Sequence, residues 1–167
     1  MLVFDASTLI ILAKADLLVV FQANFGDKVS VPSEVARECC EHKKTLDAAV
    51  IRKAVDDGRI EVLAVRNRSL VLKLQSDFSL GKGEAEAIAL AVNAKADLIG
   101  IDDRHGINAC RLLGIPFTTA LNILVRTKAK GLLETDEAMA KLAVLAKYGR
   151  YKGSMIEDAR RRLEGTA

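Results

Sequence analysis

Short, continuous apolar runs recur along the chain, and helix-like segments separate them. The runs at 1–4, 28–31, 60–65, 97–101 and 115–118 lack the period-two alternation of a half-exposed strand. Strands that are apolar throughout are typical of a parallel sheet that is covered on both faces. The pattern therefore predicts an α/β fold with three layers, α/β/α, around a mostly parallel central sheet.

The segments between and after these strands have the apolar spacing of helices and end at turn residues. Helices are expected from Ser7 and at 32–41, 46–57, 69–78, 83–95, 107–113, 121–130, 134–148 and 154–163. Gly131 interrupts the chain after the last expected strand–helix unit. We therefore expect a domain at 1–130 and a C-terminal helical extension at 131–167 that packs on the same domain.

The composition is that of an ordinary folded protein of one domain. Half of the 167 residues are hydrophobic, only 4% are aromatic and 28% are charged. A core of aliphatic side chains is expected, and a disordered chain is excluded. The net charge of +3 permits nucleic acid as a partner without requiring it.

The apolar N-terminal segment resembles neither a signal peptide nor a membrane span. It lacks a basic leader, and Asp5, Lys14 and Asp16 interrupt it. The adjacent Cys39 and Cys40 and the isolated Cys110 lack the spacing of a zinc site and are expected to be reduced thiols. These features predict a cytoplasmic protein without membrane contact.

Carboxylates follow two of the predicted strands. Asp5 ends the first strand, and Asp102 and Asp103 follow the strand at 97–101. Ligands of parallel α/β sheets bind beyond the carboxyl ends of the strands. Glu84 opens the helix after Gly83 and is expected to face the same edge, whereas Glu86 lies roughly 200° around the helix axis from it.

A further acid is expected from the helix that follows Pro32. Glu34 and Glu38 are four residues apart and share a helix face, so either could reach the strand ends. Several converging carboxylates repel one another and require divalent cations. Ligands that are all oxygen favour Mg²⁺ or Mn²⁺, and such clusters commonly serve phosphate chemistry.

The order of these acids resembles that of the PIN domain, the nuclease fold of the VapC toxins. The motifs on which the resemblance rests are LVFDAS at 2–7, VPSEVARE at 31–38, and LGKGEAEAIALA at 80–91 followed by ADLIGIDDR at 96–104. The resemblance covers about residues 1–130. It is closest to a PIN subfamily in which GEAEAI replaces an aspartate-led helix. Gly100 stands where the family commonly has Thr or Ser, and the C-terminal extension exceeds that of a minimal VapC.

The resemblance implies catalytic and metal-binding roles for Asp5, Glu38, Glu84 and Asp102. Asp103 is a further candidate metal ligand, and Ser7, Glu34 and Glu86 are candidate accessory residues. Arg104 adjoins the acids, and a cation at that rim is suited to hold RNA phosphates. The activity implied is a Mg²⁺- or Mn²⁺-dependent endoribonuclease, a toxin with RNA as substrate, a cognate antitoxin as a possible partner and a homodimer as its assembly.

Other functions fit the residues less well. A haloacid-dehalogenase-like phosphatase needs a second aspartate at the position that Ser7 occupies. A receiver domain needs an aspartate at the end of its third strand, and the run at 60–65 supplies none. The alternative that remains open is a non-catalytic PIN-fold module that binds RNA or protein.

Overall fold

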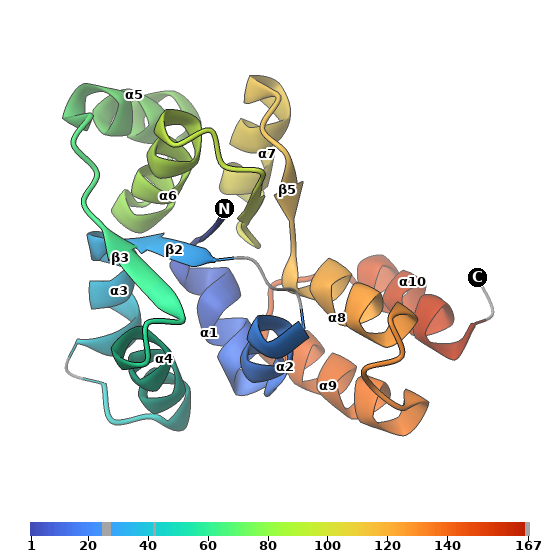
Figure 1. Cartoon of the computed structure of the whole chain (residues 1–167). Helices are drawn as coiled ribbons and strands as arrows, with labels where there is room; N and C mark the ends of the chain where they lie inside the picture. The colour runs from blue at the N-terminus through green and yellow to red at the C-terminus, as the bar shows by residue number, and fades with distance from the viewer. Residues whose placement is uncertain (25–27, 42, 166–167) are drawn as a thin grey trace.

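The computed structural model describes residues 1–24, 28–41 and 43–165. In this part of the chain, five parallel strands form one sheet of order β3-β2-β1-β4-β5. The strands are β1 (Leu2–Phe4), β2 (Val29–Pro32), β3 (Ile60–Leu63), β4 (Leu98–Gly100) and β5 (Phe117–Thr118). The predicted α/β fold with a parallel sheet is confirmed, and Figure 1 shows the helices on its two faces.

The described residues form ten helices: nine lie close to the predicted positions, and α2 was not predicted. They are α1 (Ala6–Lys14), α2 (Leu17–Asn24), α3 (Ser33–Cys40), α4 (Leu46–Asp56), α5 (Arg68–Phe78), α6 (Lys82–Asn93), α7 (Arg104–Leu113), α8 (Ala120–Ala129), α9 (Thr135–Tyr148) and α10 (Gly153–Glu164). Capping explains several starts: the side chains of Asp5, Asn67, Asp103 and Thr119 each accept a backbone N–H in the first turn of their helix.

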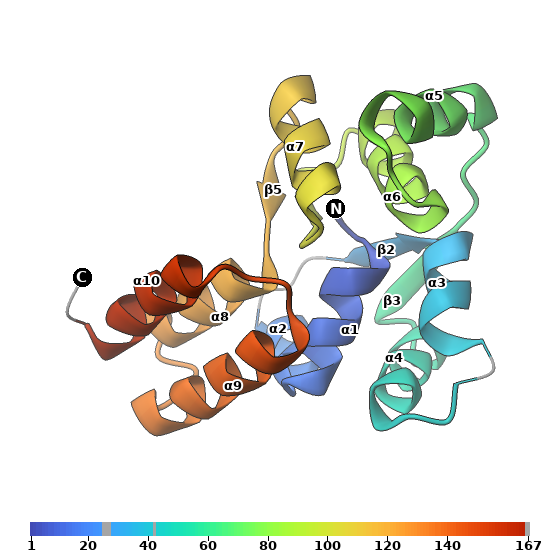
Figure 2. The same ribbon diagram turned by 180° about the vertical axis from the view of Figure 1, so that it is seen from behind.

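Two apolar cores lie on opposite faces of the sheet. Leu2 and Phe4 of β1 belong to the core beneath α1, α2, α8 and α9, whereas Val3 between them belongs to the core beneath α5, α6 and α7. This alternation places every side chain of β1 in a core, which explains why the run is apolar throughout. The helices α8, α9 and α10 gather on one side of the molecule (Figure 2).

The topology places a ligand site between β1 and β4. From β1 the chain builds β2 and β3 toward one edge, and it later returns to add β4 and β5 on the other side. The carboxyl ends of β1 and β4 therefore flank the switch point, which is where open α/β sheets bind their ligands. Asp5 directly follows β1, and Asp102 follows β4 by two residues.

Gly100 has a packing reason to be glycine. It pairs in register with Phe4 of the neighbouring strand. A Cβ atom at position 100 would lie 2.4 Å from Cδ1 of the Phe4 ring. The ring therefore excludes the larger hydroxyl residue that the resemblance would place here.

No single helix among the described residues is both long and apolar enough to cross a membrane. Helices α1 and α2 reach the necessary length only together, and they meet at a bend of 103°.

Candidate active site

Asp5 is the most deeply buried carboxylate of the site. Its exposed fraction is 0%. Oδ1 accepts the backbone N–H of Thr8 at 2.8 Å, and Oδ2 accepts the Ser7 hydroxyl at 2.7 Å. Burial raises the pKa of Asp5 from 3.8 to about 7, although these hydrogen bonds lower it, and the charge of Asp102 adds to the increase. Within the described residues Asp5 thus has no ion pair that would offset the cost of burying its charge.

Asp102 lies next to Asp5 across the switch point. Both of its carboxylate oxygens accept the backbone N–H of Ala120, at 3.2 and 3.0 Å, at the N-terminus of α8. The Tyr151 hydroxyl donates a further hydrogen bond to Oδ1. Burial nevertheless raises the pKa of Asp102, so the surrounding dipoles do not fully compensate its charge.

The Thr8 hydroxyl lies near both aspartates, the buried Asp5 and the half-buried Asp102. It lowers the pKa of Asp5 and of Asp102. Its oxygen is buried, yet it makes no hydrogen bond of ordinary geometry to any described residue. Buried polar atoms without partners are rare and commonly mark a place for a water or an ion. This orphaned oxygen fits a site built to receive a hydrated cation.

Glu38 and Glu84 form the second part of the site, between α3 and α6. A Cβ atom at Gly83 would lie 2.6 Å from Oε1 of Glu38, so the Glu38 carboxylate occupies the space above this glycine. Burial raises the pKa of Glu38, and so does the charge of Glu34. Burial also raises the pKa of Glu84, and the charges of Asp103 and Glu38 raise it further. Oε2 of Glu84 meanwhile accepts the N–H of Gly81 at 3.0 Å, in a capping box.

The structure distinguishes Glu34 from Glu38. Glu34 is 8% exposed and accepts hydrogen bonds from Arg37 and from Nζ of Lys82, the latter at 2.7 Å. These two cations lower the pKa of Glu34 to about 2. Glu38 has no ion pair among the described residues, so its charge is available to a cation while that of Glu34 is already neutralised.

The other predicted residues lie at the rim of the site or away from it. Glu86 points to α5, where Arg68 pairs with it at 2.5 Å. Asp103 caps α7 by accepting the N–H groups of His105 and Gly106, at 2.7 and 3.3 Å. Arg104 is exposed at the first position of α7 and has no ion pair within 1–24, 28–41 or 43–165. Glu86 thus links α6 to α5 through an ion pair, whereas Asp103 and Arg104 lie beside the acids of the site.

The acids do not form a closed metal cage. Among the described residues, no three His, Cys, Asp or Glu side chains are close enough together to hold a metal ion. Asp5 with Asp102 and Glu38 with Glu84 instead form two separate pairs, in each of which the charge of one member raises the pKa of the other. Their chemistry nevertheless fits Mg²⁺ or Mn²⁺, because all donors are carboxylate oxygens. The charges of Arg37 and Lys43 act on Glu38 and that of His105 acts on Glu84, but burial still raises the pKa of both glutamates.

Sequence reasoning missed Thr8, Gly83 and Tyr151 as parts of the site. Gly83 could have been suspected, because a glycine inside a helix usually has a packing reason. Tyr151 carried no signal, since it lies in the loop between α9 and α10, outside the segment that carried the acids.

Carboxylates beside the switch point of a parallel α/β sheet define the class of the protein, a fold of the nuclease type. A comparison with protein families agrees: the model described as the PIN domain matches residues 1–164, which includes the three C-terminal helices. The chain belongs to the PIN-domain family. No curated protein gave a significant match. The same is true of the solved structures.

Proposed function

We propose that the protein is an endoribonuclease that depends on Mg²⁺ or Mn²⁺. The observation that carries this proposal is a set of four carboxylates in two neighbouring pairs, Asp5 with Asp102 and Glu38 with Glu84, each of which has a raised pKa. A divalent cation bound there would neutralise a phosphodiester and make water a better nucleophile.

The side chains divide this work by position. Asp5 and Asp102 would hold the cation from the buried side, oriented by Ser7, by the N–H of Ala120 and by Tyr151. Glu38 and Glu84 have raised pKa values and lie nearer to solvent. They would take up the proton of the attacking water or complete the cation's shell. Arg104, at the rim, would hold a neighbouring phosphate of the RNA strand.

The experiment is cleavage of a mixed RNA pool with added Mn²⁺ or Mg²⁺, beside EDTA and an Asp5→Asn protein. The proposal expects cutting that requires the metal and is lost in the variant. Asn can still cap α1, so the variant should fold. Folded wild-type protein that neither cuts RNA nor binds Mn²⁺ would leave only a PIN fold that binds without catalysis.

Family membership supports a role as the toxin of a toxin–antitoxin pair, acting as a homodimer in the cytoplasm. The adjacent leucines Leu112 and Leu113 of α7 are 70% and 47% exposed and offer an apolar contact for a second chain. Co-expression with the product of the neighbouring reading frame, followed by light scattering, tests this part. We expect the two proteins to form a stable complex, and co-expression to relieve the growth arrest that this protein causes alone. A monomer that does not arrest growth would contradict it.

A further inference from the structure

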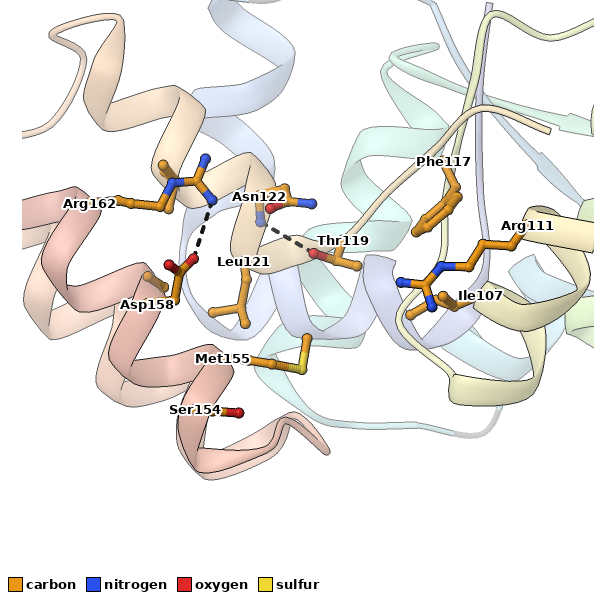
Figure 3. A pocket seen from close by; sticks show the side chains of 12 residues that line it. Ile107, Arg111, Phe117, Thr119, Leu121, Asn122, Ser154, Met155, Asp158 and Arg162 are labelled. Carbon is orange, nitrogen blue, oxygen red and sulfur yellow. Dashed lines mark hydrogen bonds and ion pairs between the residues drawn. The ribbon is translucent and has the colours of Figure 1, made fainter. Parts of the chain in front are cut away.

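A pocket of about 390 Å³ lies between α7 and β5 on one side and α10 on the other, with α8 as its floor (Figure 3). This volume lies within the range of about 300–1,000 Å³ that is typical of small-molecule sites. The sequence alone gave no indication of this pocket, because its walls come from two segments, 107–125 and 154–162, that the whole of α9 separates along the chain.

The pocket lies one residue away from the partner of an acid of the site. Thr119 lines it and caps α8, its Oγ1 accepting the N–H of Asn122 at 3.3 Å. The next residue, Ala120, donates its N–H to Asp102. On the opposite wall, Ile107 lies one helical turn after Asp103. A strand with its phosphodiester at the carboxylates could therefore place an adjoining group in the pocket.

The lining combines flat, apolar and polar surfaces. The Arg111 guanidinium lies 5.7 Å from the centroid of the Phe117 ring, and Met155 of α10 extends toward the pocket from the other side (Figure 3). Aromatic rings and guanidinium planes are the surfaces on which unpaired bases stack. Asn122 adds an amide that can both donate to and accept from a base edge.

Charge at the rim matches a nucleic acid backbone. Nη1 of Arg162 on α10 lies 3.7 Å from Oδ2 of Asp158, so these two charges offset each other. Arg111 on the opposite wall therefore gives the lining a net positive charge. An arginine at the mouth of such a pocket is suited to a flanking phosphate. The mixed polarity also argues against an apolar protein segment as the occupant.

We propose that this pocket binds one nucleotide of single-stranded RNA, next to the phosphodiester that the carboxylates hold. The inference rests on the proposed nuclease function and adds a specificity site to it. It also assigns a role to α10: the C-terminal extension supplies one wall of the substrate site. Stacking on the Arg111 and Phe117 side holds the base, and Asn122 reads its edge.

Two substitutions to tryptophan make a matched test, since the natural chain contains no Trp. Ser154→Trp places an indole in this pocket, from an exposed position on α10. Ala140→Trp does the same in a smaller hollow of about 170 Å³ between α1 and α9. The probe is a fluorescein-labelled RNA octamer. Ca²⁺ replaces Mg²⁺ or Mn²⁺, so that binding of the octamer is measured without its cleavage. Thermal melts check that both variants fold.

Ser154→Trp should weaken binding of the octamer by about tenfold, in line with the loss of one stacked base. Ala140→Trp should bind like the wild type. Asn122→Ala, a milder change, should alter which base stands beside the cut, read by sequencing the ends of Mn²⁺-dependent products.

The outcomes separate this inference from the function on which it rests. If wild type and both tryptophan variants bind and cut alike with unchanged base preference, the pocket is not a nucleotide site, while the nuclease stands. If Ser154→Trp abolishes only self-association or binding of a partner protein, the pocket is a protein interface and the inference fails. If the wild type itself neither binds nor cuts RNA, the proposed function fails, and this inference fails with it.

Discussion

The Tyr151 hydroxyl donates a hydrogen bond to Oδ1 of Asp102, joining the loop between α9 and α10 to the carboxyl end of β4. The Tyr151 ring fits closely against Gly149, where a Cβ atom would lie 2.1 Å from Cε2 of the ring. Burial and the nearby Asp102 charge raise the pKa of Tyr151, so the hydroxyl remains a donor. The C-terminal extension is thus part of the acidic site and not only a cover for the core.

Tyr151→Phe should weaken Mn²⁺ binding by about tenfold, because it removes a hydrogen bond that orients a metal-binding carboxylate. The matched control is Tyr148→Phe. Tyr148 is 49% exposed on α9 and lies near Lys14 and Lys147. Calorimetric titration with Mn²⁺ gives both affinities. Equal affinities in the two variants would show that Tyr151 does not position Asp102.

The charge of Asp5 should make the metal-free protein less stable at neutral and alkaline pH. Its folded-state pKa of about 7 lies above the unfolded value of 3.8, so the folded state binds the proton more tightly. Stability from this group is therefore present below pH 4 and is lost as the pH rises to 7, by at most about 4 kcal/mol.

Urea unfolding of wild type and Asp5→Asn in EDTA tests this prediction. The free energies of unfolding should nearly coincide at pH 4, and the variant should be the more stable at pH 8. Added Mn²⁺ should reverse the order at pH 8, because only the wild type gains a bound cation. A variant that is less stable at pH 8 in EDTA would contradict the raised pKa.

Gly83→Ala should disturb the site without unfolding the protein. The new Cβ would displace the Glu38 carboxylate, which is the mobile end of a flexible side chain. Alanine is also a better helix former than glycine, by up to about 1 kcal/mol in a helix interior and less at this position in the first turn of α6. We expect unchanged or higher stability together with reduced cleavage. Gly153→Ala at the start of α10, where a Cβ meets no atom within 4 Å, is the control. Full activity of the Gly83 variant would show that the position of the Glu38 carboxylate does not matter for cleavage.

Glu38→Gln and Glu34→Gln should have opposite effects. Glu38→Gln should abolish cleavage at little cost in stability, because this carboxylate has no ion pair in the described chain and a raised pKa. Glu34→Gln should cost about 1–2 kcal/mol, since it breaks the links to Arg37 and Lys82, but it should leave cleavage largely intact. Loss of cleavage in Glu34→Gln alone, in stable protein, would assign the catalytic role to Glu34 instead.

Much of the fold could be predicted because apolar periodicity and turn residues act locally. The continuous apolar runs predicted the parallel strands, and Gly114 predicted the end of α7, where it adopts a φ of +65°. The order of the strands in the sheet was not predicted, because local apolar patterns do not say which strands become neighbours. The separate helix α2 was not anticipated, because its start at Leu17 follows a turn in which Asp16 has a φ of +52° and no glycine marks the break.

The site was predictable only where its residues stand next to a strand or begin a helix. Asp5 and Asp102 follow strands, so the sheet topology brings them together. The roles of Glu34 and Glu86 depended on the cations that reach them, Lys82 and Arg68, and no local pattern predicts which partner a long side chain meets. Tyr151 reaches Asp102 across 49 positions, a contact set by the packing of α9 and α10 on α8.

The most direct measurement of the central claim is an anomalous difference map from crystals grown with Mn²⁺. The account predicts a peak at the carboxyl ends of β1 and β4, ligated by Asp5 and Asp102, with Glu38 or Glu84 turned toward it. The peak should be absent in Asp5→Asn crystals. A well-ordered site with Mn²⁺ present and no peak between Asp5 and Asp102 would contradict a metal-dependent nuclease.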